Sequence, residues 1–186
     1  MTPSHLGGGV PQGDSNTVMT DVWGFLLVKH EIKSILDIGC GYGHCVKWFA
    51  ENGLCSVMAI DGDPEVKEKF VGPPDRLLIH DFTTGPAPIG TPFDMAWSAE
   101  FLEHVDEQFL PNYMAAFQLC RRAVVTHGEP GQYGHHHVTL KSSNWWISKF
   151  GEFGFACDGE ETALLRRTDR WRASWGRRTL LSFVRI

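Results

Sequence analysis

The segment Ser34-Ile35-Leu36-Asp37-Ile38-Gly39-Cys40-Gly41-Tyr42-Gly43 decides the fold of this chain. Residues 34–39 form a short apolar run that is typical of a buried strand, and the amphipathic pattern of 42–52, ended by Gly53, predicts a helix directly after it. Glycines between a strand and a helix allow a sharp turn and a close approach to a ligand, with the helix N-terminus behind them. The segment therefore predicts a strand, a ligand-binding loop and a helix in succession.

The alternation of strand and helix continues on both sides of this segment. Apolar runs predict strands at 56–61, 76–81, 93–98 and 123–127, and helical spacing predicts helices at 17–30, 64–70, 106–121 and 143–153. Parallel strands need helical crossovers, so the pattern predicts an α/β fold with a doubly wound, mostly parallel sheet. Strands predicted at 162–167 and 179–185 lie too close together for a helical crossover. We expect them to form a C-terminal antiparallel hairpin that completes a seven-stranded sheet.

The length and composition indicate one folded domain. The chain has 186 residues, of which 42% are hydrophobic and 21% charged, a mixture that is sufficient for a core. We expect residues 17–186 to form the domain and residues 1–16, with Gly7-Gly8-Gly9 and two prolines, to be a flexible N-terminal segment. The net charge of -5 argues against binding nucleic acid by overall electrostatics.

The cysteines and the hydropathy indicate the compartment. Five cysteines form an odd set without a CxxC pair, which favours reduced thiols over a disulfide framework. No apolar stretch is long enough to span a membrane, and the N-terminus lacks the pattern of a signal peptide. We therefore expect a cytoplasmic protein.

Acidic residues at later strand ends narrow the choice of ligand. Asp61 ends the next strand about twenty residues after the glycine loop, where a carboxylate can accept both hydroxyls of a ribose, and Asp81 ends the third strand. A dinucleotide site favours the spacing G-x-G-x-x-G, whereas the glycines here read G-C-G-Y-G. Asp37 on the strand side of the loop would repel a pyrophosphate, but it suits a ligand that carries an ammonium group.

Residues 34–128 resemble the nucleotide-binding core of class I S-adenosylmethionine-dependent methyltransferases. The family's D/E-x-G-x-G-x-G loop is matched at every fixed position by residues 37–43, and the run 100–105 (EFLEHV) resembles the "LEHV" run common in members that act on small molecules. The family's sheet also ends in an antiparallel hairpin. The resemblance implies a Rossmann-like domain that binds S-adenosylmethionine and transfers its methyl group to a small-molecule or exposed acceptor.

The resemblance also implies a set of cofactor-binding residues. Gly39, Cys40 and Gly41 would contact the methionine portion, and Asp37 would lie near its amino group. Asp61 would hold the ribose, Asp81 would accept the adenine amino group, and Phe82 would flank the adenine ring. Ser98 would sit beside the sulfonium, and Gly43 and Gly62 complete the predicted set. The alternative is that these acids only cap strand ends and turns.

Acceptor chemistry depends on residues outside the common loop. After the fourth strand the chain reads Ser98-Ala99-Glu100, not the Asn/Asp-Pro-Pro-Tyr of family members that methylate planar amino groups, so oxygen is favoured over nitrogen. His135, His136 and His137 follow the fifth strand, where one of them could be a catalytic general base. They could instead be polar loop residues. Adjacent histidines seldom all face one ion and no carboxylates are spaced locally for it, so we predict no metal site.

Three further features leave alternatives open. Seven arginines between 166 and 185 would suit a phosphate group or merely a solvated edge, so nucleic acid (RNA) is an alternative acceptor. Trp145, Trp146, Trp171 and Trp175 could stack on a sugar or base, although at least one of the adjacent pair should pack inward. The chain could also be a non-catalytic partner subunit or a nicotinamide-dependent oxidoreductase. We interpret His104 as a hydrogen-bonded structural residue. The sequence does not set the oligomeric state.

Overall fold

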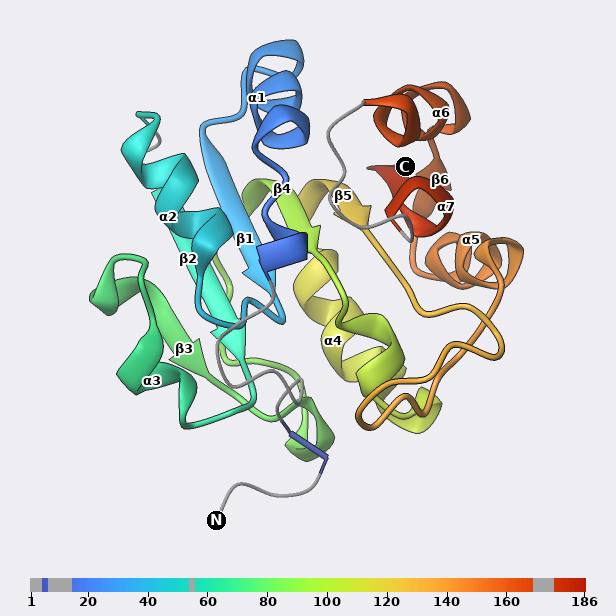
Figure 1. Cartoon of the computed structure of the whole chain (residues 1–186), viewed down its shortest axis with the longest axis horizontal. Coiled ribbons are helices and arrows are strands. Elements are labelled where there is room, and N and C mark those ends of the chain that lie inside the picture. The colour runs from blue at the N-terminus through green and yellow to red at the C-terminus, as the bar shows by residue number, and fades with distance from the viewer. Residues whose placement is uncertain (1–4, 7–14, 54–55, 169–175) are drawn as a thin grey trace.

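A seven-stranded sheet forms the centre of the structure, a computed structural model that describes residues 5–6, 15–53, 56–168 and 176–186 (Figure 1). The strands are β1 (Ser34–Ile38), β2 (Ser56–Asp61), β3 (Leu77–Ile79), β4 (Phe93–Ser98), β5 (Cys120–Val125), β6 (Phe155–Cys157) and β7 (Leu181–Arg185). Their order across the sheet is β3-β2-β1-β4-β5-β7-β6. This confirms the predicted doubly wound α/β sheet.

The pairing of the strands places the ligand-binding edge. Strands β3, β2, β1, β4 and β5 are parallel, whereas β7 is antiparallel to both β5 and β6. The chain runs outward from β1 through β2 to β3 and then crosses back to β4 on the other side of β1. In such sheets ligands bind beyond the carboxyl ends of the strands where the order reverses. Here that point lies between β1 and β4.

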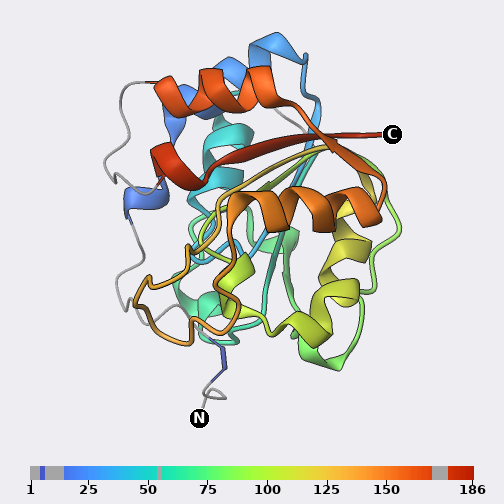
Figure 2. The ribbon, with the colours of Figure 1, turned by 90° about the vertical axis from the view of Figure 1, so that its right-hand side faces the viewer.

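Helices cover both faces of the sheet (Figures 1 and 2). They are α1 (Thr20–Lys29), α2 (His44–Glu51), α3 (Val66–Lys69), α4 (Leu110–Phe117), α5 (Ser143–Glu152), α6 (Gly159–Arg167) and α7 (Gly176–Thr179). One apolar cluster joins α1, α2 and α6 to the sheet through residues such as Leu26, Phe49 and Leu165. A second cluster joins α4 and α5 to the other face through residues such as Phe117 and Phe150. Burial of both faces explains why the strands read as continuous apolar runs.

The prediction of a strand at Thr162–Arg167 is wrong, because these residues belong to α6. The Asp158 side chain accepts a hydrogen bond from the Glu161 backbone amide at 2.9 Å and caps the helix. Acidic residues in the first turn and arginines in the last turn also suit the helix dipole. The strand that pairs with β7 is β6, a run of three residues between Gly154 and Asp158. The C-terminal antiparallel pair is therefore present, but helices α6 and α7 connect its strands.

The predicted long helix at 106–121 is shorter in the structure. Asp106 accepts a hydrogen bond from the Gln108 amide at 3.0 Å and starts a 3-10 turn, Glu107–Phe109, before α4. Pro111 lies in the first turn of α4, where its missing amide proton costs no hydrogen bond. The next strand begins at Cys120, so Arg121 lies in β5.

Some predictions concern residues outside the described part of the chain. Residues 1–4 and 7–14, Trp171, Trp175, Arg170, Arg172 and Cys55 are among them. The four described cysteines, Cys40, Cys45, Cys120 and Cys157, are free thiols. Among the described residues, every helix is too short or too polar to cross a bilayer.

Candidate active site

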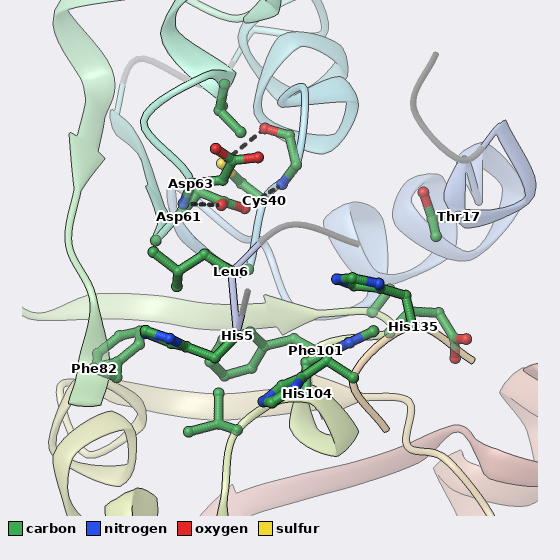
Figure 3. A pocket seen from close by; sticks show the side chains of 18 of the residues that line it. His5, Leu6, Thr17, Cys40, Asp61, Asp63, Phe82, Phe101, His104 and His135 are labelled. Carbon is green, nitrogen blue, oxygen red and sulfur yellow. Dashed lines mark hydrogen bonds between the residues drawn. The ribbon is translucent and has the colours of Figure 1, made fainter. Parts of the chain in front are cut away.

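A cavity of about 1040 Å³ opens at the carboxyl edge of the sheet, where the strand order reverses between β1 and β4 (Figure 3). The loops that follow β1, β2, β3 and β4 line one part of it. The 3-10 helix η4 (Leu102–His104) and the loop at 132–137 line another part, and His5, Leu6 and Thr17 contribute from the N-terminal region. The cavity therefore joins the glycine loop and the histidine loop in one space.

The glycine loop is held in place by the neighbouring strand. The backbone amides of Gly39 and Cys40 donate to the Ile60 carbonyl at 2.9 and 3.0 Å. Gly39 has φ of +73°, and a Cβ at this position would lie 2.4 Å from the Phe101 ring. A side chain therefore fits here neither sterically nor conformationally. Gly43 has φ of +78° at the start of α2 and does not line the cavity.

Asp37 is nearly buried but borders the cavity. Its exposed fraction is 3%, and burial, followed by the charge of Asp61, raises the pKa of the carboxyl well above its ordinary value. Burial, followed by the charges of Asp61 and Asp37, also raises the pKa of the Cys40 thiol. Two carboxylates and a neutral thiol at the base of the loop favour a ligand with a positive group.

Asp61 joins the glycine loop to the end of β2. One carboxylate oxygen accepts a hydrogen bond from the Gly41 amide at 2.8 Å, and the other accepts one from the Asp63 amide at 2.9 Å. Burial raises the pKa of Asp61 to about 6, although these backbone hydrogen bonds act in the opposite direction. Asp61 and Gly62 both line the cavity.

Asp81 is engaged by its own loop and by the N-terminal region. It accepts a hydrogen bond from the Thr83 amide at 2.8 Å and pairs with His5 Nε2 at 2.9 Å. Although burial acts to raise the pKa of Asp81, the hydrogen bonds from His5 and Thr83 lower it overall. Phe82 is buried beside it and lines the cavity. Leu6 covers Gly62, because a Cβ on this glycine would lie 2.6 Å from Leu6 Cδ2. The sequence did not identify His5 and Leu6 as site residues.

The structure does not bring Ser98 to the cavity. Its side chain is fully buried, and its hydroxyl donates to the Ile38 carbonyl at 2.8 Å. Glu100, two residues later, lines the cavity instead. Its backbone has φ of +52° and its amide donates to the Thr126 hydroxyl at 2.9 Å, so β5 fixes the direction of this turn.

The three predicted loop histidines all line the cavity. His135 is exposed, and His136 and His137 are half-buried. The amides of Val138 and Thr139 donate to the Glu103 carbonyl at 2.9 and 3.1 Å, so the end of this loop is attached to η4.

Other polar residues near the histidine loop are used within the fold. His127 is buried, with Nε2 at 2.9 Å from the Ser143 hydroxyl, and burial lowers its pKa. Glu129 pairs with Arg178 at 2.8 Å. Both contacts hold the polypeptide that leads into the loop.

A buried carboxylate and two imidazoles lie together between η4 and the histidine loop. The Glu103 side chain has no exposed surface, and burial, with the charge of Glu100, raises its pKa well above the ordinary value. Burial and then the neighbouring His137 lower the pKa of His104 to about 4. The His104 ring forms a hydrogen bond with the His135 backbone, whereas its Nδ1 has no partner among the described residues. The pair Glu103-His104 was visible in the sequence, but nothing there connected it with His137.

The arginines and tryptophans contribute little to this cavity. Arg166 donates to the Leu180 carbonyl at 2.8 Å, and Arg185 donates to the Gln118 carbonyl. None of the cluster's described arginines lines the cavity. Trp146 is fully buried, which confirms the expectation that one tryptophan of the adjacent pair packs inward. Lys141 Nζ lies over the Trp145 ring, 4.9 Å from its centroid.

Comparison with solved structures places the fold among methyltransferases. The magnesium protoporphyrin IX methyltransferase (ChlM) of Synechocystis PCC 6803, crystallised with bound S-adenosylmethionine, is 17% identical with a TM-score of 0.62 over 94% of this chain and 86% of that one. A TehB-like S-adenosylmethionine-dependent methyltransferase of Corynebacterium glutamicum ATCC 13032 Kitasato is 18% identical with a TM-score of 0.62 over 89% and 88%. The mitomycin 7-O-methyltransferase MmcR is 13% identical with a TM-score of 0.61 over 90% and 53%.

Sequence comparison gives the family. A search of curated proteins found no match. A family model described as a methyltransferase domain matches residues 36–129, half of the chain, and the match covers the glycine loop, Asp61, Asp81 and η4. The chain therefore belongs to the family of class I S-adenosylmethionine-dependent methyltransferases.

Proposed function

We propose that the chain transfers the methyl group of S-adenosylmethionine to an oxygen atom of a small molecule. The observation that carries this proposal is the single cavity that joins the glycine loop to the histidine loop. A methyl donor and an acceptor can meet in such a space, whose volume of about 1040 Å³ is at the upper end of the range for small-molecule sites, about 300–1,000 Å³. One of the proteins with the same fold is an O-methyltransferase.

The residues around the glycine loop suit the cofactor. The cofactor supplies a methyl group on a positively charged sulfonium, and the protein mainly positions it. Asp37 is placed to pair with an ammonium group, and the Asp61 carboxylate lies beside Gly62, where ribose hydroxyls can donate to it. Asp81 and Phe82 provide an acceptor and an aromatic face for the adenine. His5 would have to release Asp81 for the adenine to use it, because the two are now paired.

The histidine loop is the proposed acceptor side. Methylation of a hydroxyl requires that its proton leave, and an imidazole nitrogen of His135, His136 or His137 can take it. All three side chains line the cavity, and His135 is the most exposed of them. A small molecule is favoured over a nucleic acid because none of the described C-terminal arginines borders the same space.

A transfer assay tests the proposed function. S-adenosylmethionine labelled on its methyl group is incubated with separate pools of small metabolites, glycans, proteins and nucleic acids. We expect label in the small-metabolite pool for the wild type and for Asp75→Ala, an exposed carboxylate outside the cavity. We expect much less label for Asp61→Ala, whose S-adenosylhomocysteine affinity should fall by about 1 to 3 kcal/mol because the ribose loses a charged acceptor. Label in the nucleic-acid pool alone would refute the small-molecule acceptor.

Single substitutions test the proposed base. His135→Asn, His136→Asn and His137→Asn should each bind S-adenosylhomocysteine as the wild type does, and at least one should lose turnover. Val138→Ala is the control, because Val138 is exposed in the same part of the chain and does not line the cavity. If all three histidine variants turn over normally, none of these side chains is the base.

A further inference from the structure

Three ligand atoms converge between η4 and the histidine loop: a carboxylate oxygen of Glu103 and ring nitrogens of His104 and His137. All of them lie within 4.8 Å of one another. We propose that Glu103, His104 and His137 bind one divalent transition-metal ion of the Zn²⁺ type at the acceptor side of the cavity.

The polar atoms of this cluster lack partners in the described structure. Neither carboxylate oxygen of Glu103 makes a well-formed hydrogen bond, although the side chain has no exposed surface; its polar neighbours are the Gly128 amide and the Glu100 carboxyl. Nδ1 of His104 and Nδ1 of His137 are also buried without a partner. Buried polar groups are nearly always hydrogen-bonded, and buried charges are paired or coordinate metals. Four orphaned atoms from three residues at one place therefore point to a missing cation.

The fold builds this arrangement from segments that are distant in sequence. The Glu103 carbonyl accepts both the Val138 and the Thr139 amides, so the backbone after His137 is fixed to η4. The His104 and His137 ring centroids are 4.9 Å apart at an interplanar angle of 82°. Two ligands of one ion, each about 2.0–2.2 Å from it, can lie at most about 4.4 Å apart. Small side-chain rotations from the present spacing would therefore close the site.

Gly134 makes room for the His137 ring. A Cβ on Gly134 would lie 2.1 Å from His137 Nε2, so any larger residue would displace the imidazole. His136, which lies between Gly134 and His137 in the sequence, has φ of +50°, a conformation that non-glycine residues seldom adopt. The turn at 134–137 is thus shaped so that the His137 ring lies against Gly134 and beside the His104 ring of η4.

The donor set selects the class of ion. Two imidazoles and one carboxylate with an open position are typical of catalytic Zn²⁺ and of related first-row ions, whereas Mg²⁺ prefers oxygen ligands. The prediction of no metal site considered only carboxylates near the loop. One loop histidine is used rather than three, and its carboxylate partner comes from η4, which is distant in sequence but contacts the loop.

The open position would face the proposed acceptor. His104 and His137 line the cavity, whereas Glu103 lies behind them. An acceptor oxygen could complete the coordination of the ion, and this role rests on the proposed function. Metal binding itself does not depend on it.

Metal binding by the full chain tests the inference. Protein treated with a chelator and dialysed is titrated with Zn²⁺, with Co²⁺ as a spectroscopic probe and with Mg²⁺ as a comparison. We expect one Zn²⁺ per chain, a visible Co²⁺ absorption band and much weaker Mg²⁺ binding. Loss of a group that only hydrogen-bonds to a metal ligand weakens metal binding by about 10- to 100-fold. Glu103→Gln and His137→Asn each remove a ligand, so they should weaken Zn²⁺ binding by more than this and should remove the Co²⁺ band.

Matched variants separate loss of a ligand from loss of structure. Asp75→Asn, at an exposed carboxylate outside the cavity, and His136→Asn, in the same loop as His137, should bind Zn²⁺ as the wild type does. Gly134→Ala retains all three ligands but displaces the His137 ring, so it should also weaken binding. S-adenosylhomocysteine affinity should be unchanged by the chelator and by His137→Asn, which distinguishes failure of this inference from failure of the proposed function. Absence of stoichiometric Zn²⁺ binding, or equal binding by Glu103→Gln, would overturn the inference.

Discussion

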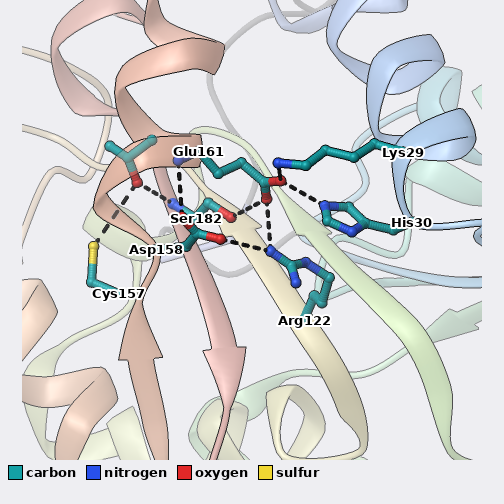
Figure 4. Close-up of polar contacts among 8 residues, drawn as sticks. Lys29, His30, Arg122, Cys157, Asp158, Glu161 and Ser182 are labelled. Carbon is teal, nitrogen blue, oxygen red and sulfur yellow. Dashed lines mark hydrogen bonds and ion pairs between the residues drawn. The ribbon is translucent and has the colours of Figure 1, made fainter.

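Glu161 and Glu103 are both buried glutamates, with exposed fractions of 1% and 0%, but they have opposite surroundings. Glu161 lies at the junction of α1, β5, α6 and β7 and is surrounded by donors (Figure 4). Glu103 lies between η4 and the histidine loop, and neither of its carboxylate oxygens makes a well-formed hydrogen bond. The exposed fraction of a buried acidic residue therefore does not indicate its role, whereas the hydrogen-bond donors around its carboxylate do.

The donors of Glu161 come from segments far apart in the sequence. Lys29 Nζ, His30 Nε2 and the Ser182 hydroxyl contact its carboxylate at 2.7, 2.6 and 2.6 Å. Arg122 donates to it at 3.0 Å and also pairs with Asp158 at 3.1 Å. Burial acts to raise the pKa of Glu161, but the donors outweigh it and lower the pKa to about 2. This network fastens α1 and α6 to the antiparallel side of the sheet.

The largest expected effect is the loss of the Glu161 charge. Glu161→Gln retains the volume but leaves Lys29 and Arg122 without their shared anion, so the free energy of unfolding should fall by about 3 to 5 kcal/mol. Urea denaturation at neutral pH measures this change. Glu160→Gln, on the exposed side of the same turn, is the control and should have almost no effect. Equal stability of both variants would contradict the role of the network.

A pH dependence of slightly smaller size should accompany this network. Because folding lowers the pKa of Glu161 from its ordinary value of 4.5 to about 2, its stabilisation is present above pH 4.5 and is lost as the pH falls toward 2. The loss should be about 3 kcal/mol for this group. The difference in unfolding free energy between wild type and Glu161→Gln, measured at several acidic pH values, should therefore shrink toward zero. A difference that stays constant across this range would be inconsistent with a charged Glu161.

The same substitution at Glu103 should have the opposite sign. In chelator-treated protein, Glu103→Gln should raise the free energy of unfolding by about 1 kcal/mol, because an amide is cheaper to bury than an unpaired carboxylate. Urea denaturation without metal and with saturating Zn²⁺ tests this. The added ion should stabilise the wild type but not the variant. A large loss of stability in the metal-free variant would mean that Glu103 has donors like those of Glu161.

The smallest effect is expected for an exposed member of the network. The Lys29 side chain is 40% exposed, so its ion pair with Glu161 is partly screened by solvent. Lys29→Met should lower the free energy of unfolding by less than about 1 kcal/mol. The comparison is Arg122→Met, whose side chain is 16% exposed and bonds two carboxylates, and which should cost more. If urea denaturation shows a larger loss of unfolding free energy for Lys29→Met than for Arg122→Met, the burial of a donor does not determine its contribution to stability.

The sheet was predictable because its signals are local. Five strands and the connecting helices could be predicted from apolar runs and glycine positions, since the parallel part of the sheet is buried on both faces and reads directly as apolar sequence. The prediction failed at 162–167, where the short run Thr-Ala-Leu-Leu-Arg-Arg is compatible with both a strand and a helix. Only the cap at Asp158 and the short strand before it distinguish the two, and both are easily overlooked in a sequence.

By itself the sequence determined the α/β fold, the glycine loop and the strand-end aspartates, because each depends on residues adjacent in the chain. Tertiary structure alone decided that Ser98 turns away from the cavity, that His5 pairs with Asp81 and that Glu103 and His104 meet His137. These contacts join segments separated by long stretches of chain. Their geometry is set by how loops pack once the sheet has formed, and no local pattern records it.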